Sequence, residues 1–175
     1  MDAEYCQGLA PQWDAASRVL VLGSMPGIAS LQAARYYAHP RNRFWPLMGL
    51  LCGLDPGAPY EARLHALNRA GVSLWDVIGQ CRRRGSLDAS IVRGSEVPNP
   101  IPTLLARLPG LQLIACNGAA AHRAFDRFIA AELDAPLQVP VLALPSTSPA
   151  NAAASLPALQ RAWQPVADAL RADSG

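Results

Sequence analysis

Runs of apolar residues alternate along the chain with longer amphipathic segments, and this alternation predicts an order of strands and helices. The apolar runs predict four strands, at Val19–Gly23, Val72–Trp75, Leu111–Cys116 and Val139–Leu144. The amphipathic segments predict helices at Ile28–Arg35, Phe44–Leu51, Tyr60–Ala70, Ile101–Leu108, Ala119–Leu133 and Leu156–Ala172. Strands that are almost continuously apolar and separated by helices are typical of a parallel sheet covered on both faces. We therefore expect an α/β fold, a three-layer α/β/α sandwich around a central, mainly parallel four-stranded sheet.

Polar or turn-forming residues follow each predicted strand directly. They are the turn Gly23-Ser24-Met25-Pro26-Gly27, Asp76, Asn117-Gly118, and the loop PSTSPAN at residues 145–151. Right-handed crossovers bring the carboxyl ends of parallel strands to one edge of the sheet, where α/β proteins bind their ligands. Two of these features also have simpler interpretations: the turn at residues 23–27 as a tight strand-to-helix turn, and the loop at residues 145–151 as a helix N-terminal region with Ser155 as cap.

The segment from Tyr36 to Trp45, YYAHPRNRFW, combines aromatic, amide and guanidinium side chains in a stretch that contains a proline. Aromatic rings stack on unpaired bases and arginines contact phosphates, a common division of roles in sites for an unstacked nucleotide. We therefore interpret this segment as part of a nucleotide site. Phe44 and Trp45, which open the following helix, are expected in the core.

Length and composition favour one domain, residues 1–175, whose first sixteen residues we expect to form a loosely ordered N-terminal segment. No apolar run approaches the roughly 20 residues that span a bilayer, and the N-terminus does not resemble a secretory signal. The four cysteines are scattered and are interpreted as reduced thiols of a cytoplasmic protein. None of the three histidines has ligand spacing with another, so we expect no metal and no cofactor.

With a net charge of only +2, the chain is less basic than a non-specific nucleic-acid binder. All fifteen basic residues are arginine, so no lysine can form a Schiff base. The polar connection Gln80–Pro102 is too long for an ordinary link and either packs across the site or is a surface insertion. Within it, Arg82-Arg83-Arg84 is expected to be a solvated face, or a phosphate contact if a nucleic-acid groove lies near.

Two motifs of the chain resemble those of the uracil-DNA glycosylase superfamily: GSMPG followed by YYAHPRNRFW, within residues 23–45, and LPSTSPAN at residues 144–151. With the strand end at Asn117, the resemblance covers most of the chain. In its details the sequence is most similar to the hypoxanthine-DNA (deoxyinosine) glycosylase branch. The resemblance implies a monofunctional glycosylase, acting on DNA that contains deaminated bases, without contact to a membrane and as a monomer.

The implied reaction flips out a deaminated base, chiefly hypoxanthine, and hydrolyses its glycosidic bond to leave an abasic site. Asn42 falls at the essential amide of the branch, where it orients water or stabilises the departing base. Tyr37 falls at the ring that stacks on the flipped base, and Asn117 at a contact to the base edge. The expected base-binding residues are Gly23, Ser24, Met25, Pro26, Gly27, Tyr37, His39 and Asn117; the expected DNA contacts are Arg41, Ser146, Thr147, Ser148 and Pro149.

Three positions depart from the patterns of related branches. Met25 stands where mismatch-specific relatives have a water-positioning Asn, and Leu144 where the most active uracil-specific enzymes have a His. Ser148 occupies the position of an apolar wedge, which Pro149 could replace. Efficient uracil excision is therefore not expected. The alternatives are a mismatch-type uracil/thymine glycosylase on the same fold, a non-catalytic binder of damaged DNA, and a small-molecule nucleotide enzyme.

Overall fold

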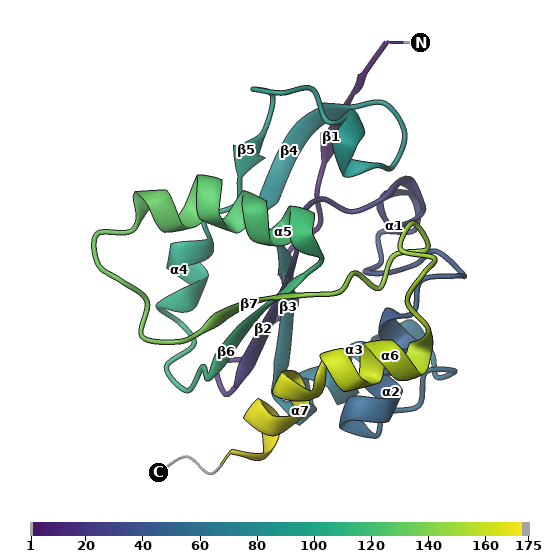
Figure 1. Cartoon of the computed structure of the whole chain (residues 1–175), viewed down its shortest axis with the longest axis vertical. Coiled ribbons are helices and arrows are strands. Elements are labelled where there is room, and N and C mark those ends of the chain that lie inside the picture. Colours follow the sequence, from purple (N-terminus) through teal and green to yellow (C-terminus); the bar gives the residue numbers. More distant parts are fainter. Residues whose placement is uncertain (1, 173–175) are drawn as a thin grey trace.

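A four-stranded parallel sheet lies at the centre of the computed structural model, which describes residues 2–172 (Figure 1). Its strands are β2 (Val19–Gly23), β3 (Val72–Asp76), β6 (Leu113–Asn117) and β7 (Val141–Leu144). Their order is β3-β2-β6-β7, and every neighbouring pair is parallel. The four predicted strands and their parallel arrangement are confirmed.

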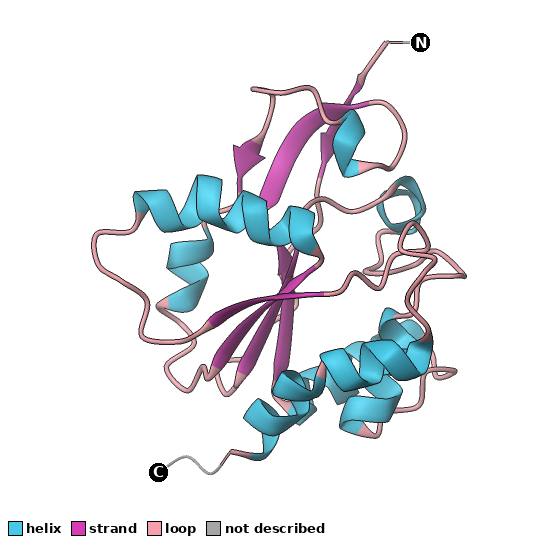
Figure 2. Cartoon of the chain, viewed as in Figure 1, coloured by secondary structure: helices cyan, strands magenta, loops and turns pink. Residues whose placement is uncertain are grey.

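Alternate side chains of each strand enter different cores, as the two-residue period of a strand requires. Val19 and Val21 pack into one buried cluster, whereas Leu20 and Leu22 pack into the other. Helices cover both faces of the sheet, which confirms the three-layer sandwich (Figure 2). One face carries α2 (Phe44–Cys52), α3 (Tyr60–Ala70), α6 (Leu156–Ala162) and α7 (Gln164–Arg171); the other carries α4 (Ile101–Leu105) and α5 (Ala119–Ala124).

Two predicted helices are interrupted. The segment expected as one helix from Leu156 divides at Trp163, because Pro165 in the first turn of α7 has no N–H to continue the α6 ladder. Ser155 caps α6 as expected, since its hydroxyl accepts from the Ala158 N–H at 3.2 Å. After α5 the chain continues as a π-helical turn, η2 (Phe125–Ile129), and a short 3-10 turn, η3 (Ala130–Glu132).

A second, antiparallel sheet has the order β1-β4-β5 and was not predicted. Its strands are β1 (Glu4–Gln7), β4 (Ile78–Arg83) and β5 (Val97–Pro98). The first sixteen residues, expected to be loosely ordered, therefore include a paired strand: Glu4–Gln7 lies opposite residues 80–83. Backbone hydrogen bonds hold this segment, including two between Gln12 and Leu74 at 2.9 and 2.8 Å. The sequence of β1, EYCQ, has no apolar pattern that predicts a strand.

The long connection after β3 thus forms β4, a short 3-10 turn η1 (Asp88–Ser90) and β5. It packs beside α1 (Ile28–Ala33), where the Ile28 N–H donates to Ser86 Oγ at 2.9 Å. The connection therefore packs across the predicted site and is not merely a surface insertion. Within residues 2–172, no helix combines the length and the apolar character needed to cross a bilayer.

Candidate active site

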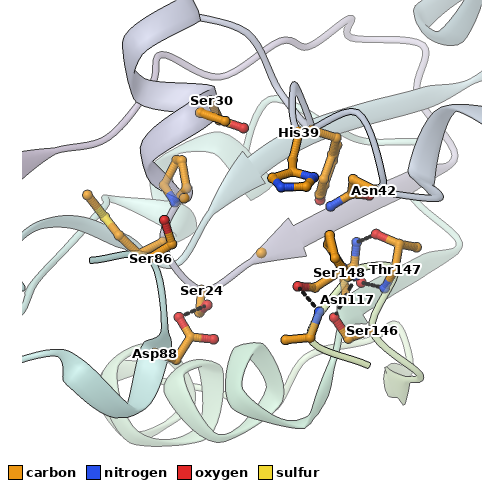
Figure 3. A pocket seen from close by; sticks show the side chains of 18 of the residues that line it. Ser24, Ser30, His39, Asn42, Ser86, Asp88, Asn117, Ser146, Thr147 and Ser148 are labelled. Atoms are coloured by element: carbon orange, nitrogen blue, oxygen red, sulfur yellow. Dashed lines mark hydrogen bonds between the residues drawn. The ribbon is translucent and has the colours of Figure 1, made fainter. Parts of the chain in front are cut away.

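A cavity of about 340 Å³ opens at the carboxyl ends of the parallel strands (Figure 3). Its size suits a small ligand such as a single base. The expected site residues that line it are Gly23, Ser24, Met25, Pro26, Gly27, Tyr37, His39, Asn42, Asn117, Ser146, Thr147, Ser148 and Pro149. Of the expected set, only Arg41 is outside the lining; it is exposed, and its N–H donates to His39 Nδ1 at 3.1 Å.

The turn at residues 23–27 forms one wall of the cavity. Backbone N–H groups of Val77 and Ile78 donate to the carbonyls of Gly23 and Ser24 at 2.8 and 2.9 Å, which fixes the turn to the start of β4. The Met25 side chain points into the core, since only 6% of it is exposed. This position therefore contributes apolar packing, and no polar side-chain group, to the cavity.

Tyr37 lines the cavity with its ring supported from behind. Its ring stacks on Phe44, with centroids 3.9 Å apart and an angle of 25° between planes. Tyr37 also has a left-handed backbone with φ of 55°, which costs a residue other than glycine about 1 kcal/mol or more. Burial and, secondarily, the charge of Asp76 raise the pKa of its hydroxyl, so the group is a hydrogen-bond donor at neutral pH.

Asn42 and His39 lie on another side of the cavity (Figure 3). Asn42 Oδ1 accepts from the Phe44 N–H at 2.9 Å, at the start of α2. Because a backbone N–H requires an acceptor, this contact identifies the oxygen of the amide and assigns Nδ2 to the opposite position. Asn42 therefore keeps a donor amide while its oxygen accepts from the N–H of the first residue of α2.

Arg43 does not have the phosphate-binding position that its sequence context suggests. Its Nη2 donates to the carbonyls of Ser148 and Asn151 at 3.0 and 2.8 Å, and its N–H donates to the Thr147 carbonyl at 3.0 Å. All three bonds join the segment around Asn42 to the loop at residues 145–151. Arg43 is a structural link between the two motifs.

Asn117 holds the same loop from the end of β6. Its Oδ1 accepts from the Thr147 N–H and its Nδ2 donates to Thr147 Oγ1, both at 3.0 Å. Thr147, expected to contact DNA, has no exposed surface and instead anchors the loop. Ser146 and Ser148 stay partly exposed beside it, with the Ser148 N–H donating to Ser146 Oγ at 3.1 Å.

Asp76 and Asp88 form an acidic wall of the cavity. Asp76 is the last residue of β3 and is 5% exposed, while Asp88 opens η1 and accepts a hydrogen bond from Ser24 Oγ at 2.7 Å. Burial first, and then the charge of Asp88, raises the pKa of Asp76 to about 7, against an opposing effect of Arg83. In the sequence, Asp76 directly follows the apolar run that predicts this strand.

Arg83 is buried behind this wall, contrary to the solvated face expected for the arginine run. It is 1% exposed, and its Nη2 donates to the Pro26 carbonyl. Its Nε and Nη1 have no hydrogen-bond partner among the described residues. The alternation of β4 explains the difference, because Arg82 faces solvent while Arg83 faces the core.

The cavity therefore combines a supported aromatic ring, an amide donor and a carboxyl group of raised pKa. Such a set can stack a flat heterocycle, donate hydrogen bonds to its edge and supply or accept a proton. Among the described residues, no three His, Cys, Asp or Glu side chains are grouped to hold a metal ion.

Comparison with known proteins agrees with this geometry. The model of the uracil DNA glycosylase superfamily matches residues 10–167. A hypoxanthine DNA glycosylase of Methanosarcina barkeri is 39% identical over 113 residues, 64% of this chain and 70% of that protein. A second, of Methanosarcina acetivorans, is 35% identical over 116 residues, 66% and 72% of the two chains.

A solution NMR structure of a protein from Methanosarcina acetivorans, described as a uracil DNA glycosylase, has the same fold. It superimposes with a TM-score of 0.80 at 29% identity, covering 97% of this chain and all of that one. The family model spans the central sheet and both motifs that form the cavity. On these grounds the chain belongs to the uracil DNA glycosylase superfamily.

Proposed function

We propose that this protein is a monofunctional hypoxanthine DNA glycosylase, which hydrolyses the bond between hypoxanthine and deoxyribose and leaves an abasic site. The observation that carries the proposal is the pairing of Tyr37 and Asn42 in one cavity, a stacking ring beside an amide donor. The names of both Methanosarcina relatives support the choice of base. The burial of Met25 supports it further, because no polar group stands there to position water for a pyrimidine.

In the proposed reaction the flipped base stacks on Tyr37, whose other face rests on Phe44. Extrusion costs a few kcal/mol, and less where pairing is weak, as for a deaminated base. As the glycosidic bond lengthens, the sugar gains positive charge and the base gains negative charge. Donors fixed in advance toward the base are then worth more than in water.

Asn42 supplies the donor in this proposal. Its oxygen is engaged by the Phe44 N–H, so the amide nitrogen is the group that remains for the substrate. A donor at this position favours hydrogen bonding to an acceptor atom of the departing base over withdrawal of a proton from water. Arg41, exposed beside the cavity, and the partly exposed Ser146 are the proposed phosphate contacts.

The test is base release from labelled duplexes that carry hypoxanthine, uracil, xanthine or a G·T mismatch. We expect hypoxanthine release, with strand cleavage only after alkali because the chain has no lysine for a lyase step. Uracil release without hypoxanthine release would assign the protein to the pyrimidine-specific alternatives. Tight binding of damaged duplexes without release of any base would favour a non-catalytic binder.

The most discriminating variant is Asn42→Asp, which keeps the oxygen that accepts from the Phe44 N–H and removes the amide donor. We expect hypoxanthine release to fall at least a hundredfold, as when one preorganised donor is removed, with thermal stability near that of the wild type. Gln164→Glu, the same change on the exposed start of α7, is the matched control and should keep full activity. Retention of activity by Asn42→Asp would refute the role of the amide.

A further inference from the structure

Asp76 is a buried carboxyl group with an unsatisfied oxygen at the edge of the cavity. It ends β3 directly beside Gly23 of β2, and it lines the cavity. Its Oδ2 has no hydrogen-bond partner among the described residues, although the side chain is 95% buried. An ionised carboxylate in this state is costly, so the site favours a protonated carboxyl or one that meets a ligand.

The Asp76 carboxyl group lies near Gly23 and Tyr37, which also line the cavity. A Cβ built on Gly23 would be 2.3 Å from Asp76 Oδ1 and 3.8 Å from the Tyr37 hydroxyl, so these three groups converge. Only glycine leaves room there. The carboxyl group of Asp76 is therefore close to the ring on which the base is proposed to stack.

Charged groups from two other elements face Asp76. Asp88 on η1 raises its pKa and buried Arg83 on β4 lowers it, while burial has the largest effect. The balance, a pKa of about 7, keeps much of Asp76 protonated at neutral pH. Asp88 is held in place by Ser24, and both lie across the cavity from Asn42 in Figure 3. The nearby Tyr36 and Tyr37 stay neutral because burial raises the pKa of each hydroxyl.

We propose that Asp76 is the acid that protonates the purine as it leaves. This inference rests on the proposed glycosylase function. The bond from C1′ to N9 breaks and its electron pair stays with the base, while the Asp76 proton moves to a ring nitrogen of the purine. Water forms the new C1′–O bond, and the proton it loses returns through solvent to the Asp76 carboxylate.

The chemistry explains a preference for purines. Hypoxanthine carries ring nitrogens with free lone pairs that accept a proton, whereas neutral uracil has none. General acid catalysis of this kind typically contributes between roughly a hundredfold and ten thousandfold in rate. Asn42 and Asp76 thus act on the base in different ways, one through a hydrogen bond and the other through a proton.

The test is the pH dependence of single-turnover hypoxanthine release by wild type, Asp76→Asn, Asp88→Asn and Asp168→Asn. Wild-type rates should fall as the pH rises above about 7. The rate of Asp76→Asn should be at least a hundredfold lower than that of wild type, and it should no longer fall as the pH rises. Asp88→Asn should move the decline to lower pH, because the charge that raises the Asp76 pKa is gone. The control Asp168→Asn, on the exposed face of α7, should match wild type.

Two results would overturn the proposal. Wild-type rates that rise with pH through the same range would show that Asp76 acts as a base. An Asp76→Asn rate within about threefold of wild type would show that Asp76 has no catalytic role. Thermal melting of each variant separates a folding defect from a catalytic one. A shift of the pH profile by Asp88→Asn is a readout that a merely structural role would not produce.

A binding measurement tests whether Asp76 contacts the base, even if the wild type releases no hypoxanthine and the proposed function fails. Fluorescence anisotropy would follow a duplex carrying 2′-fluoro-deoxyinosine, whose glycosidic bond resists hydrolysis, from pH 5.5 to 8.5. Affinity of the wild type should fall above pH 7 relative to an undamaged duplex, and that of Asp76→Asn should not. Identical pH dependence of the two proteins would overturn the contact between Asp76 and the base.

Discussion

The amide of Asn117 holds Thr147 at two points, with Oδ1 accepting from its N–H and Nδ2 donating to its hydroxyl, both at 3.0 Å. This contact crosses from the end of β6 to the loop that follows β7. It assigns to Asn117 the task of shaping the cavity wall, in addition to the base contact that the family resemblance implies. Thr147 is wholly buried, so the loop is anchored from inside.

Thr147→Val should therefore destabilise the protein, because it keeps the shape of the side chain but removes the hydroxyl that receives the Asn117 amide. We expect a loss of about 1–3 kcal/mol in the free energy of unfolding, the cost of an unpaired buried donor. Urea denaturation measures it, and amide hydrogen exchange should quicken at residues 145–151. Thr103→Val on α4, which is exposed, is the control. Equal stability of the two variants would contradict the anchoring role.

Two arginines two positions apart should behave differently toward DNA. Arg41 is exposed, whereas Arg43 is bonded to the carbonyls of Ser148 and Asn151. Arg41→Ala should lower the slope of log affinity against log salt by about 0.9, as for one lost phosphate contact. Arg43→Ala should leave the slope unchanged but lower stability and base release. Titration of duplex binding at several salt concentrations tests both; a reduced slope for Arg43→Ala would place its side chain on phosphate.

The arrangement of the strands was predictable because each has a nearly continuous apolar run that ends at a turn or polar residue. The period of two along β2 sends Val21 to one core and Leu22 to the other, so a strand covered on both faces leaves a clear signal. The turn at residues 23–27 and the segment around Asn42 were also recognisable, since both combine special backbone residues with polar chemistry in short stretches.

The acidic wall and the second sheet were not predictable in the same way. Asp76 and Asp88 meet only because β4 returns the chain to the cavity, and nothing local in the sequence encodes that approach. Arg83 lies in a run of three arginines that predicts a solvent-exposed surface. Its side chain is buried only because β4 pairs with β1. The oxygen and nitrogen of Asn42 likewise acquire separate tasks only once α2 begins at Phe44.

Gly23→Ala should disrupt the site through the Asp76 carboxyl. The added Cβ would lie 2.3 Å from Asp76 Oδ1, a separation that forces one group to move. We expect a loss of about 1–3 kcal/mol in stability, as for other overpacked positions, and a large loss of hypoxanthine release. The double variant Gly23→Ala/Asp76→Ala should regain most of the stability and none of the activity. Additive stability losses in a double-mutant cycle would show that the two side chains do not collide.

The stability of the protein should decline with rising pH because of Asp76. Its pKa is raised to about 7 in the folded protein, against about 3.9 unfolded, so the folded state binds the proton more tightly and the advantage is lost as the pH rises from 4 through 7. A shift of this size corresponds to about 4 kcal/mol at full ionisation, an upper bound on the decline. Urea denaturation between pH 4.5 and 8 should show this decline in wild type and in the control Asp168→Asn, and a smaller one in Asp76→Asn. If Asp76→Asn declined as steeply as wild type, the carboxyl would be ionised throughout, and the proton proposed for the leaving purine would have no source.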